Sequence, residues 1–223
     1  MTNRTYGQYC GFARALEVVG ERWAMLVVRD LLVEPKRFTD LQNGLPGIPS
    51  NVLSARLKEL EHGGVVRRRA LPRPARGVVY ELTEYGLELE PVVAELGRWG
   101  AKSLGDPRPG ETITTDSLIT ALRSTFRSEA AQGYHAGYEV RVGEIVFHAR
   151  VDDGRVAVAA GPLSNADLVI ETGPGIRALM AGELSPAGAI DSGTVHITGD
   201  PALLTRFAEI FRIDPMPARA LHE

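Results

Sequence analysis

The sequence is poor in the features that mark secreted, membrane or disulfide-bonded proteins. It has a single cysteine, Cys10, which excludes an intramolecular disulfide and is typical of a reducing cytoplasm. No apolar run approaches the roughly 20 residues that a membrane helix needs. Residues 1–10 lack the apolar segment of a signal peptide. We therefore expect a cytoplasmic protein with no membrane partner.

Motifs for catalysis are missing as well. No HxxxH or CxxC spacing supports a metal site, residues 173–182 lack the lysine of a phosphate-binding loop, and no serine lies in a G-x-S-x-G elbow. The adjacent carboxylates of Asp152 and Asp153 are more typical of a hairpin turn than of a catalytic pair. The sequence thus predicts a protein that is not an enzyme and holds neither cofactor nor metal.

The net charge of −3 conceals an asymmetry between the two halves of the chain. Residues 1–105 hold 15 Lys and Arg against 12 Asp and Glu, a net charge of +3. Residues 106–223 hold 10 against 16, a net charge of −6. Because a polyanion responds to the local field and not to total charge, a nucleic-acid surface is expected in the first half.

The stretch 49–71 carries the clearest signal for DNA binding. Three leucines recur at i, i+4 and i+7 within the predicted helix Ser50–His62, whose opposite side is small, polar and basic. Two glycines end this helix, and the basic strand Arg67–Arg69 follows. A thin polar helix face can enter the major groove of DNA, and arginines beside it can bind the phosphate backbone. Taken alone, the same pattern also describes an ordinary packed helix and a solvated strand.

The neighbouring segments favour the DNA-binding interpretation. A short helix, a tight turn and a second helix follow one another in the helix-turn-helix order, and a Pro-rich loop between two strands makes a wing. In the second of the leading helices, Asp30 is expected near the exposed side. The other expected elements are helices at Cys10–Val19, Glu21–Val33, Phe38–Asn43 and Glu84–Lys102, the last capped by Thr83, and a strand at Val78–Leu82.

Three blocks in this half together resemble the HxlR-type winged helix-turn-helix regulators of bacteria. They are CGFARALEVVGERWAMLVVRDLL, RFTDLQNGLPGIPSNVLSARLKELEHGGVVRR and VVYELTEYG, within about Cys10–Leu104. The resemblance implies a homodimer formed by the first and last helices of this domain and sequence-specific binding to promoter DNA. It also implies that Ser50–His62 is the recognition helix and Arg67–Leu82 the wing. Where the family commonly has Ser-Pro, this chain has Pro49-Ser50, so we expect Ser50 to act as the helix cap.

The expected DNA-contacting residues follow from this arrangement. Asn51 and Ser54 offer hydrogen bonds to base edges, and Ala55 offers a methyl contact to thymine. The remaining contacts are assigned mainly to the phosphate backbone. The complete set is Ser50, Asn51, Ser54, Ala55, Lys58, Arg67, Arg68, Arg73 and Arg76.

Cys10 has two interpretations. In some regulators of the resembling family, an N-terminal cysteine at this place senses oxidants or electrophiles, and Arg14 lies one helical turn further on. The alternative is a small buried residue at a dimer interface, because free cysteine is commonly buried.

The second half begins after the polar linker Gly105–Glu111 and predicts an α+β domain. Residues 137–161 alternate around the hairpin signal Asp153-Gly154, with further strands at 167–171 and 195–197. Helices are expected at Thr115–Ala131, Gly175–Ala181 and Ala202–Phe211, the last opened by Asp200-Pro201. The result is an antiparallel sheet with helices on one face.

Residues 115–213 resemble the sterol-carrier-protein-like fold in strand order, glycine pattern and closing Leu/Phe helix. The resemblance implies a pocket for an apolar small-molecule effector between sheet and helices. The alternative is that the same side chains fill a solid core. The candidate lining residues are Phe126, Tyr138, Phe147, Leu179, Met180, Leu184, Ile190, Phe207 and Phe211.

The complete prediction is a dimeric two-domain regulator of α+β class. Residues 1–105 form a winged helix-turn-helix domain for DNA binding and dimerisation, and residues 112–215 form a ligand-binding domain. The alternative is a lipid or acyl carrier whose winged domain serves dimerisation or protein docking, although the wing arginines count against it.

Overall fold

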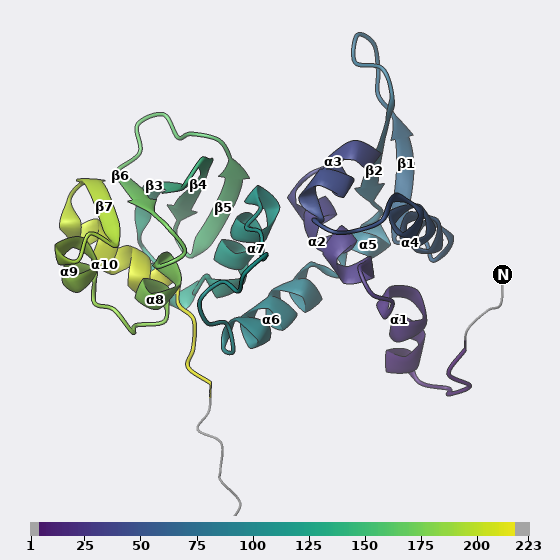
Figure 1. Cartoon of the computed structure of the whole chain (residues 1–223), viewed down its shortest axis with the longest axis horizontal. Helices are drawn as coiled ribbons and strands as arrows, with labels where there is room; N and C mark the ends of the chain where they lie inside the picture. Colours follow the sequence, from purple (N-terminus) through teal and green to yellow (C-terminus); the bar gives the residue numbers. More distant parts are fainter. Residues whose placement is uncertain (1–4, 217–223) are drawn as a thin grey trace, which may run out of the picture. The chain divides into compact units, whose positions relative to one another are not determined.

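The computed structural model describes residues 5–216 and divides into two compact units, unit 1 (Met1–Val93) and unit 2 (Ala94–Glu223) (Figure 1). The expected linker Gly105–Glu111 is free of helix and strand, but the division between the units falls earlier, inside the helix Glu90–Ala101. The domain limits 1–105 and 112–215 remain predictions. Within residues 5–216, no helix is both long and apolar enough to cross a membrane.

Unit 1 is a small helical core with a two-stranded hairpin. Its elements are α1 (Gly11–Val19), α2 (Ala24–Val33), α3 (Phe38–Gly44), α4 (Ser50–His62), β1 (Val66–Ala70), β2 (Val78–Leu82), α5 (Glu84–Leu87) and the start of α6 (Glu90–Ala101). The predicted leucine stripe of α4 is confirmed, because Leu53, Leu57 and Leu60 are all buried. They pack in one cluster with apolar residues of α2, α3, β1 and β2.

Three expectations for unit 1 are corrected. The helix expected from Glu21 begins at Ala24, because Trp23 takes a left-handed backbone with φ 80°. Asp30 is fully buried and not near the exposed side, and Arg29 Nε donates to its Oδ1 at 2.8 Å. The helix expected at 84–102 is two helices, α5 and α6. Proline has no N–H and clashes with the carbonyl four residues earlier, so Pro91 is tolerated only in the first turn of α6.

Unit 2 is built around one five-stranded sheet. Besides most of α6, its elements are α7 (Thr115–Thr125), η1 (Glu129–Ala131), β3 (His135–Val142), β4 (Ile145–Asp152), β5 (Arg155–Ala160), β6 (Leu168–Thr172), α8 (Ile176–Met180), α9 (Pro186–Asp191), β7 (Val195–Gly199) and α10 (Pro201–Ile210). The predicted hairpin at Asp153-Gly154 is confirmed, with φ 44° and 73°. Asp200 caps α10, accepting from Ala202 N at 2.9 Å.

The sheet of unit 2 is mixed and not wholly antiparallel. The strand order is β5-β4-β3-β6-β7, and the pair β3–β6 is parallel while the other pairs are antiparallel. The connection from β5 to β6 therefore returns across β4 and β3 instead of making a hairpin. Leu163 in this connection packs over Gly137, where an added Cβ would lie 2.7 Å from Leu163 Cδ2. A wholly antiparallel order was expected because the sequence shows no signal for this crossing.

Two helices of unit 2 also differ from expectation. The helix expected at Thr115–Ala131 ends at Thr125, where Phe126 becomes extended and pairs with Phe211 in an isolated β-bridge. The helix α9 was not anticipated, although Ser185 caps it and Pro186 occupies its first position. Both differences arise at points where short segments follow tertiary packing more than helical periodicity.

Candidate nucleic-acid interface

The turn between α3 and α4 fixes the position of α4 in unit 1. Leu45 and Ile48 of this turn are buried, and Ile48 N donates to Leu45 O at 3.1 Å. Gly47 supplies the left-handed backbone, with φ 84°. With its leucine stripe buried in the core, α4 must turn its other side outwards.

The outward side of α4 carries the residues predicted to read bases. Ser50, Asn51 and Lys58 are exposed, and Ser54 and Ala55 are half-buried. Ser50 is not the cap that the sequence suggested, because Pro49 holds the cap position and Ser50 is the first helical residue. The serine hydroxyl is thus not committed to a cap hydrogen bond.

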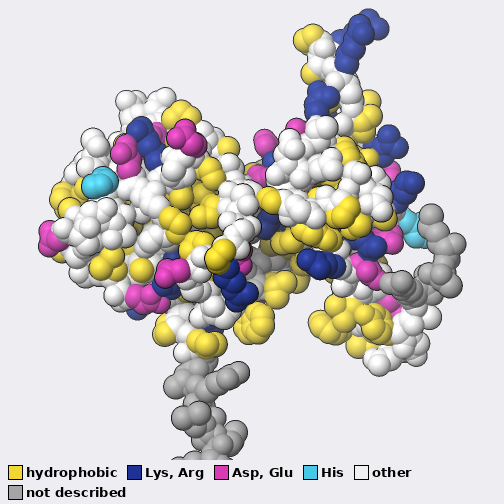
Figure 2. Space-filling view, in the orientation of Figure 1, with side chains coloured by type: hydrophobic (Ala, Val, Ile, Leu, Met, Phe, Trp, Pro, Cys, Tyr) yellow, Lys and Arg dark blue, Asp and Glu magenta, His cyan; other side chains and the backbone are white. Residues whose placement is uncertain are grey.

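The wing is the hairpin of β1, β2 and their connecting loop, 71–77, which extends away from the helices of unit 1 (Figure 1). Figure 2 shows Lys and Arg side chains at the end of this hairpin. Arg68, Arg73 and Arg76 are exposed, and their side chains form no ion pair with the described residues. Three of the predicted phosphate contacts are therefore available to solvent.

Arg67 and Arg69 are in a different situation. Arg67 Nε lies 2.9 Å from Glu81 Oε1, and Arg69 Nε lies 2.6 Å from Glu81 Oε2. These hydrogen bonds, with that of Arg69 the larger, lower the pKa of the Glu81 carboxyl. One carboxylate thus binds two wing arginines, one of which, Arg67, was predicted to bind phosphate.

Both ends of the wing are anchored to the rest of unit 1. At the loop, Arg37 Nη1 donates to Arg76 O at 2.9 Å. Glycine is favoured at position 77 because φ is 126°, and an added Cβ, 2.3 Å from Arg37 Nη1, would also displace the end of that side chain. At the base, Thr83 Oγ1 donates to Gly64 O at 2.6 Å and accepts from Gly86 N at 3.0 Å, which confirms Thr83 as a helix cap.

Sequence reasoning missed three residues of this surface, namely Arg37, Arg69 and Glu81. A signal was present for Arg69, which lies one strand period after Arg67, whereas Glu81 is placed only by the register of the hairpin. In a hairpin, alternate residues share a face, so Arg67 and Arg69 lie on one face together with Glu81, the register partner of Arg67. Arg37 had no such signal because it reaches the loop across 39 residues of sequence.

Large apolar side chains near α1 and on α6 are exposed. On and before α1, the aromatic rings of Tyr9 and Phe12 are exposed. On α6, Val92, Leu96 and Trp99 form one stripe at i, i+4 and i+7, and each side chain is at least half exposed. We call this set the α6 stripe. Large exposed apolar groups of this kind commonly mark interaction surfaces.

Cys10 lies at the N-cap position of α1 and is exposed. Arg14, one turn on, has its guanidinium 2.9 Å from Glu17 Oε2. The single chain therefore leaves Cys10 exposed, and its burial at a dimer interface stays a prediction.

Four of the nine predicted apolar effector residues in unit 2 are aromatic rings in contact with one another, namely Phe126, Tyr138, Phe207 and Phe211. Tyr138, Phe207 and Phe211 are fully buried, with ring centroids of Phe207 and Phe211 4.8 Å apart and those of Tyr138 and Phe207 5.3 Å apart. Phe147, Leu179 and Met180 are also buried, while Phe126, Leu184 and Ile190 are half-buried. An apolar ligand among these side chains would have to separate rings that are in contact.

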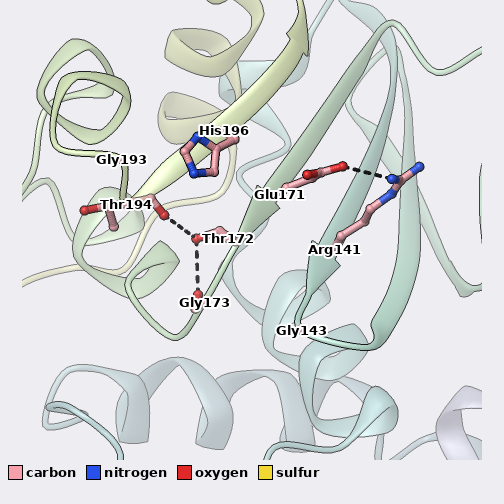
Figure 3. Close-up of a pocket in the computed structure, with 8 residues that line it drawn as sticks. All are labelled: Arg141, Gly143, Glu171, Thr172, Gly173, Gly193, Thr194 and His196. Atoms are coloured by element: carbon pink, nitrogen blue, oxygen red, sulfur yellow. Dashed lines mark hydrogen bonds and ion pairs between the residues drawn. The ribbon is translucent and has the colours of Figure 1, made fainter.

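A hollow of about 540 Å³ occurs elsewhere on unit 2 and is lined by none of these nine residues (Figure 3). Its floor is one row of register partners across three strands, Arg141, Glu171 and His196. Arg141 Nη1 donates to Glu171 Oε1 at 2.9 Å, and its Nε donates to Glu139 Oε1 at 2.8 Å. Among the described residues, no group of three or more His, Cys, Asp and Glu could hold a metal ion.

The helix-turn-helix of α3 and α4 with its wing defines the class of a winged helix-turn-helix protein, and relatives of known class match it. The model of the HxlR-like helix-turn-helix family matches residues 18–107. The uncharacterized HTH-type transcriptional regulator YvaP of Bacillus subtilis is 37% identical over 91 residues, which is 41% of this chain and 84% of the relative. The HTH-type transcriptional regulator YodB of Bacillus subtilis is 36% identical over 99 residues, which is 44% of this chain and 86% of the relative. The solved reduced form of YodB is 34% identical, covers 47% of this chain and 100% of that chain, and superposes with a TM-score of 0.38.

The chain therefore belongs to the HxlR-like helix-turn-helix family. Through residues 18–107 it is a DNA-binding transcriptional regulator with an N-terminal winged helix-turn-helix. The family match ends at residue 107, so most of unit 2 lies beyond it.

Proposed function

We propose that the chain binds double-stranded operator DNA as a homodimer, with α4 in the major groove and the wing on the phosphate backbone. The observation that carries the proposal is that unit 1 exposes both the polar side of α4 and the wing arginines that have no ion pair. A helix whose apolar side is fully buried and whose other side is short and polar suits close approach to base edges.

The residues divide into two roles. Asn51 and Ser54 hydrogen-bond base edges, Ala55 contacts a thymine methyl group, and Ser50 at the helix N-terminus contacts base or phosphate. Lys58, Arg67, Arg68, Arg73 and Arg76 neutralise phosphates.

The homodimer is proposed from the exposed apolar side chains. Phe12 on α1 is 74% exposed and Trp99 on α6 is 72% exposed, so each ring leaves most of its apolar surface in water in the single chain. Pairing through α1 and α6 removes this surface from water. A twofold axis duplicates α4, so the operator is expected to be palindromic, with half-sites about one helical turn of DNA apart.

Fluorescence anisotropy tests the DNA proposal, with the DNA upstream of the chain's own gene and an unrelated duplex as the two probes. Asn51→Ala is expected to weaken binding to the upstream DNA by about 1–3 kcal/mol and to leave binding to the unrelated duplex unchanged. Arg73→Ala is expected to weaken both equally and to reduce the salt slope by about one unit. Arg150→Ala, an exposed arginine of unit 2, is the matched control and should change neither.

Equal affinity of the wild-type protein for both duplexes would contradict sequence-specific binding. A salt slope that is unchanged in Arg73→Ala would remove this arginine from the phosphate contacts. A monomer at micromolar concentration by sedimentation velocity would contradict the homodimer.

We also propose that Cys10 senses oxidants or electrophiles. The proposal is supported by the exposure of its thiol and by a YodB relative whose solved structure is described as a reduced form. Treatment with diamide should join the Cys10 thiols of two chains in an intermolecular disulfide while diamide is reduced to its hydrazine, seen as a doubled mass without reductant. It should change DNA affinity in the wild type but not in Cys10→Ser. A mass change without any change in affinity would leave Cys10 reactive but not a sensor.

Finally, we propose that unit 2 has a sterol-carrier-protein-like fold and responds to an apolar effector bound among the nine residues described above. Such a ligand must bind the DNA-competent and DNA-incompetent arrangements with different affinity, since otherwise it shifts no equilibrium. Native mass spectrometry of the purified protein tests this by revealing a co-purified small molecule. Failure to find one, together with no thermal stabilisation by long-chain fatty acids, would favour a solid core.

A further inference from the structure

The wing separates its arginines onto two faces. The register pairs Arg67 with Glu81 and Arg68 with Tyr80, so Arg67, Arg69 and Glu81 share one face while Arg68 lies on the other. Each of the two arginines on the first face uses its own oxygen of the Glu81 carboxylate, at 2.9 Å and 2.6 Å. The three side chains therefore form one cluster with a net charge of +1, where the two arginines alone would give +2.

The position of the carboxylate within this cluster matters for a polyanion. The Glu81 side chain is only 12% exposed, whereas those of Arg67 and Arg69 are 65% and 44% exposed. The carboxylate thus lies beneath two guanidinium groups, close enough to act on any phosphate that they meet. A partly buried charge is less screened by salt than an exposed one, so its repulsion of a phosphate persists at physiological ionic strength.

We propose that Glu81 is an internal counter-charge that lowers the attraction of the wing for the phosphate backbone irrespective of base sequence. Arg67 and Arg69 then contribute less to binding than Arg68 and Arg73, and discrimination depends more on α4. The inference rests on the proposed DNA-binding function and adds to it a negatively charged residue, Glu81, that opposes the binding of phosphate. A glutamate carboxyl is ionised at neutral pH, and the hydrogen bonds from Arg69 and Arg67 lower the pKa of Glu81 further below its usual range.

The test removes the charge and nearly keeps the shape of the side chain. In Glu81→Gln, the amide oxygen still accepts from one arginine, while the amide NH2 cannot accept from the other, which is thereby released. Binding to a generic duplex should tighten several-fold at 0.1 M salt, and the salt slope should steepen by about 0.9 for the one charge removed. Glu88→Gln is the matched control, because Glu88 is exposed after α5 and has no ion pair with the described residues.

A double-mutant cycle locates the effect. If Glu81 repels the phosphate itself, Glu81→Gln should still tighten binding when Arg67 and Arg69 are both alanine, whereas loss of the effect in that background would contradict the counter-charge. Should Glu81→Gln fold poorly by circular dichroism, Glu81→Thr supplies a second neutral variant, since threonine favours strands.

Elution from a heparin column separates this inference from the proposed function. Heparin is a polyanion without bases, so later elution of Glu81→Gln than of Glu88→Gln supports the counter-charge even if the wild type fails to bind duplex DNA. If the wild type shows no salt-dependent binding to a duplex, the proposed function is contradicted, but the counter-charge is not. Identical elution of the two variants, or weaker duplex binding by Glu81→Gln, overturns the counter-charge. The second result would mean that Glu81 positions its arginines for phosphate.

Discussion

The helices α4 and α6 have the same spacing of apolar residues, but these residues are buried in α4 and exposed in α6. In α4, Leu53, Leu57 and Leu60 at i, i+4 and i+7 are buried almost completely. In α6, Val92, Leu96 and Trp99 at the same spacing are 51%, 51% and 72% exposed. Helical periodicity therefore identifies the apolar side of a helix but not what covers it. For α4 the cover is the core of unit 1, and for α6 we propose a second chain.

The largest expected effect comes from a third apolar helix, α10. Phe207→Ala should lower the free energy of unfolding of unit 2 by about 3–5 kcal/mol, because the ring is fully buried against Tyr138 and Phe211. Urea denaturation followed by circular dichroism measures the change. Phe12→Ala, which removes an exposed ring, is the control. A cost below about 1 kcal/mol would indicate that the ring already borders a void, as an effector pocket requires.

The α4 stripe should respond nearly as strongly. Leu57→Ala is expected to cost about 2–5 kcal/mol in unit 1, since the side chain is 2% exposed and leaves a cavity. Fluorescence of Trp23 in a Trp99→Phe background reports unit 1 alone, because the chain has one tryptophan in each unit. Leu26→Ala removes the same atoms from an exposed site on α2 and should cost much less.

The next prediction concerns a buried charge in unit 2, the carboxylate of Glu139. Hydrogen bonds from Leu163 N, the larger influence, and from Arg141 lower the pKa of the Glu139 carboxyl below its unfolded value. The carboxylate thus stabilises the fold above the unfolded pKa of about 4.3, and this stabilisation is lost as the pH falls through the folded pKa. Glu139→Gln should cost about 1–3 kcal/mol at pH 7 and flatten the loss of stability below about pH 4.5. Urea midpoints at pH 7 and pH 3.5 provide the measurement, and a loss on acidification as steep as in the wild type would assign the acid sensitivity to other carboxyl groups.

The smallest effect on the single chain is expected in the α6 stripe. Leu96→Ala should change the free energy of unfolding by no more than about 0.5 kcal/mol at concentrations where the chain is monomeric. The same variant should weaken self-association in sedimentation velocity, with Glu90→Ala on the same helix as the control. A stability loss comparable to that of Leu57→Ala, without any change in association, would contradict the contrast between the two stripes.

Local signals were sufficient where local chemistry decides the structure. The bounds of α4, the hairpin at Asp153-Gly154 and the caps at Thr83 and Asp200 follow from periodicity, left-handed glycine and capping side chains. The parallel pair β3–β6 and the burial of Asp30 did not follow, because each depends on partners far along the chain or on packing around the side chain. In the site, exposure of the α4 polar side was predictable from its buried stripe. The ion pairs of Glu81 required the register of the hairpin.

The double anchoring of the wing has a consequence for the entropy of association. Arg37 holds the loop and Thr83 holds the base, so the hairpin is bonded to the rest of unit 1 at two points. Because these bonds restrict the hairpin before any duplex arrives, we expect a smaller entropic cost of ordering it on DNA binding. Replacing Arg37 with a residue that does not reach the Arg76 carbonyl would remove one of these bonds. The entropic cost of ordering the hairpin would then be added to the free energy of DNA binding.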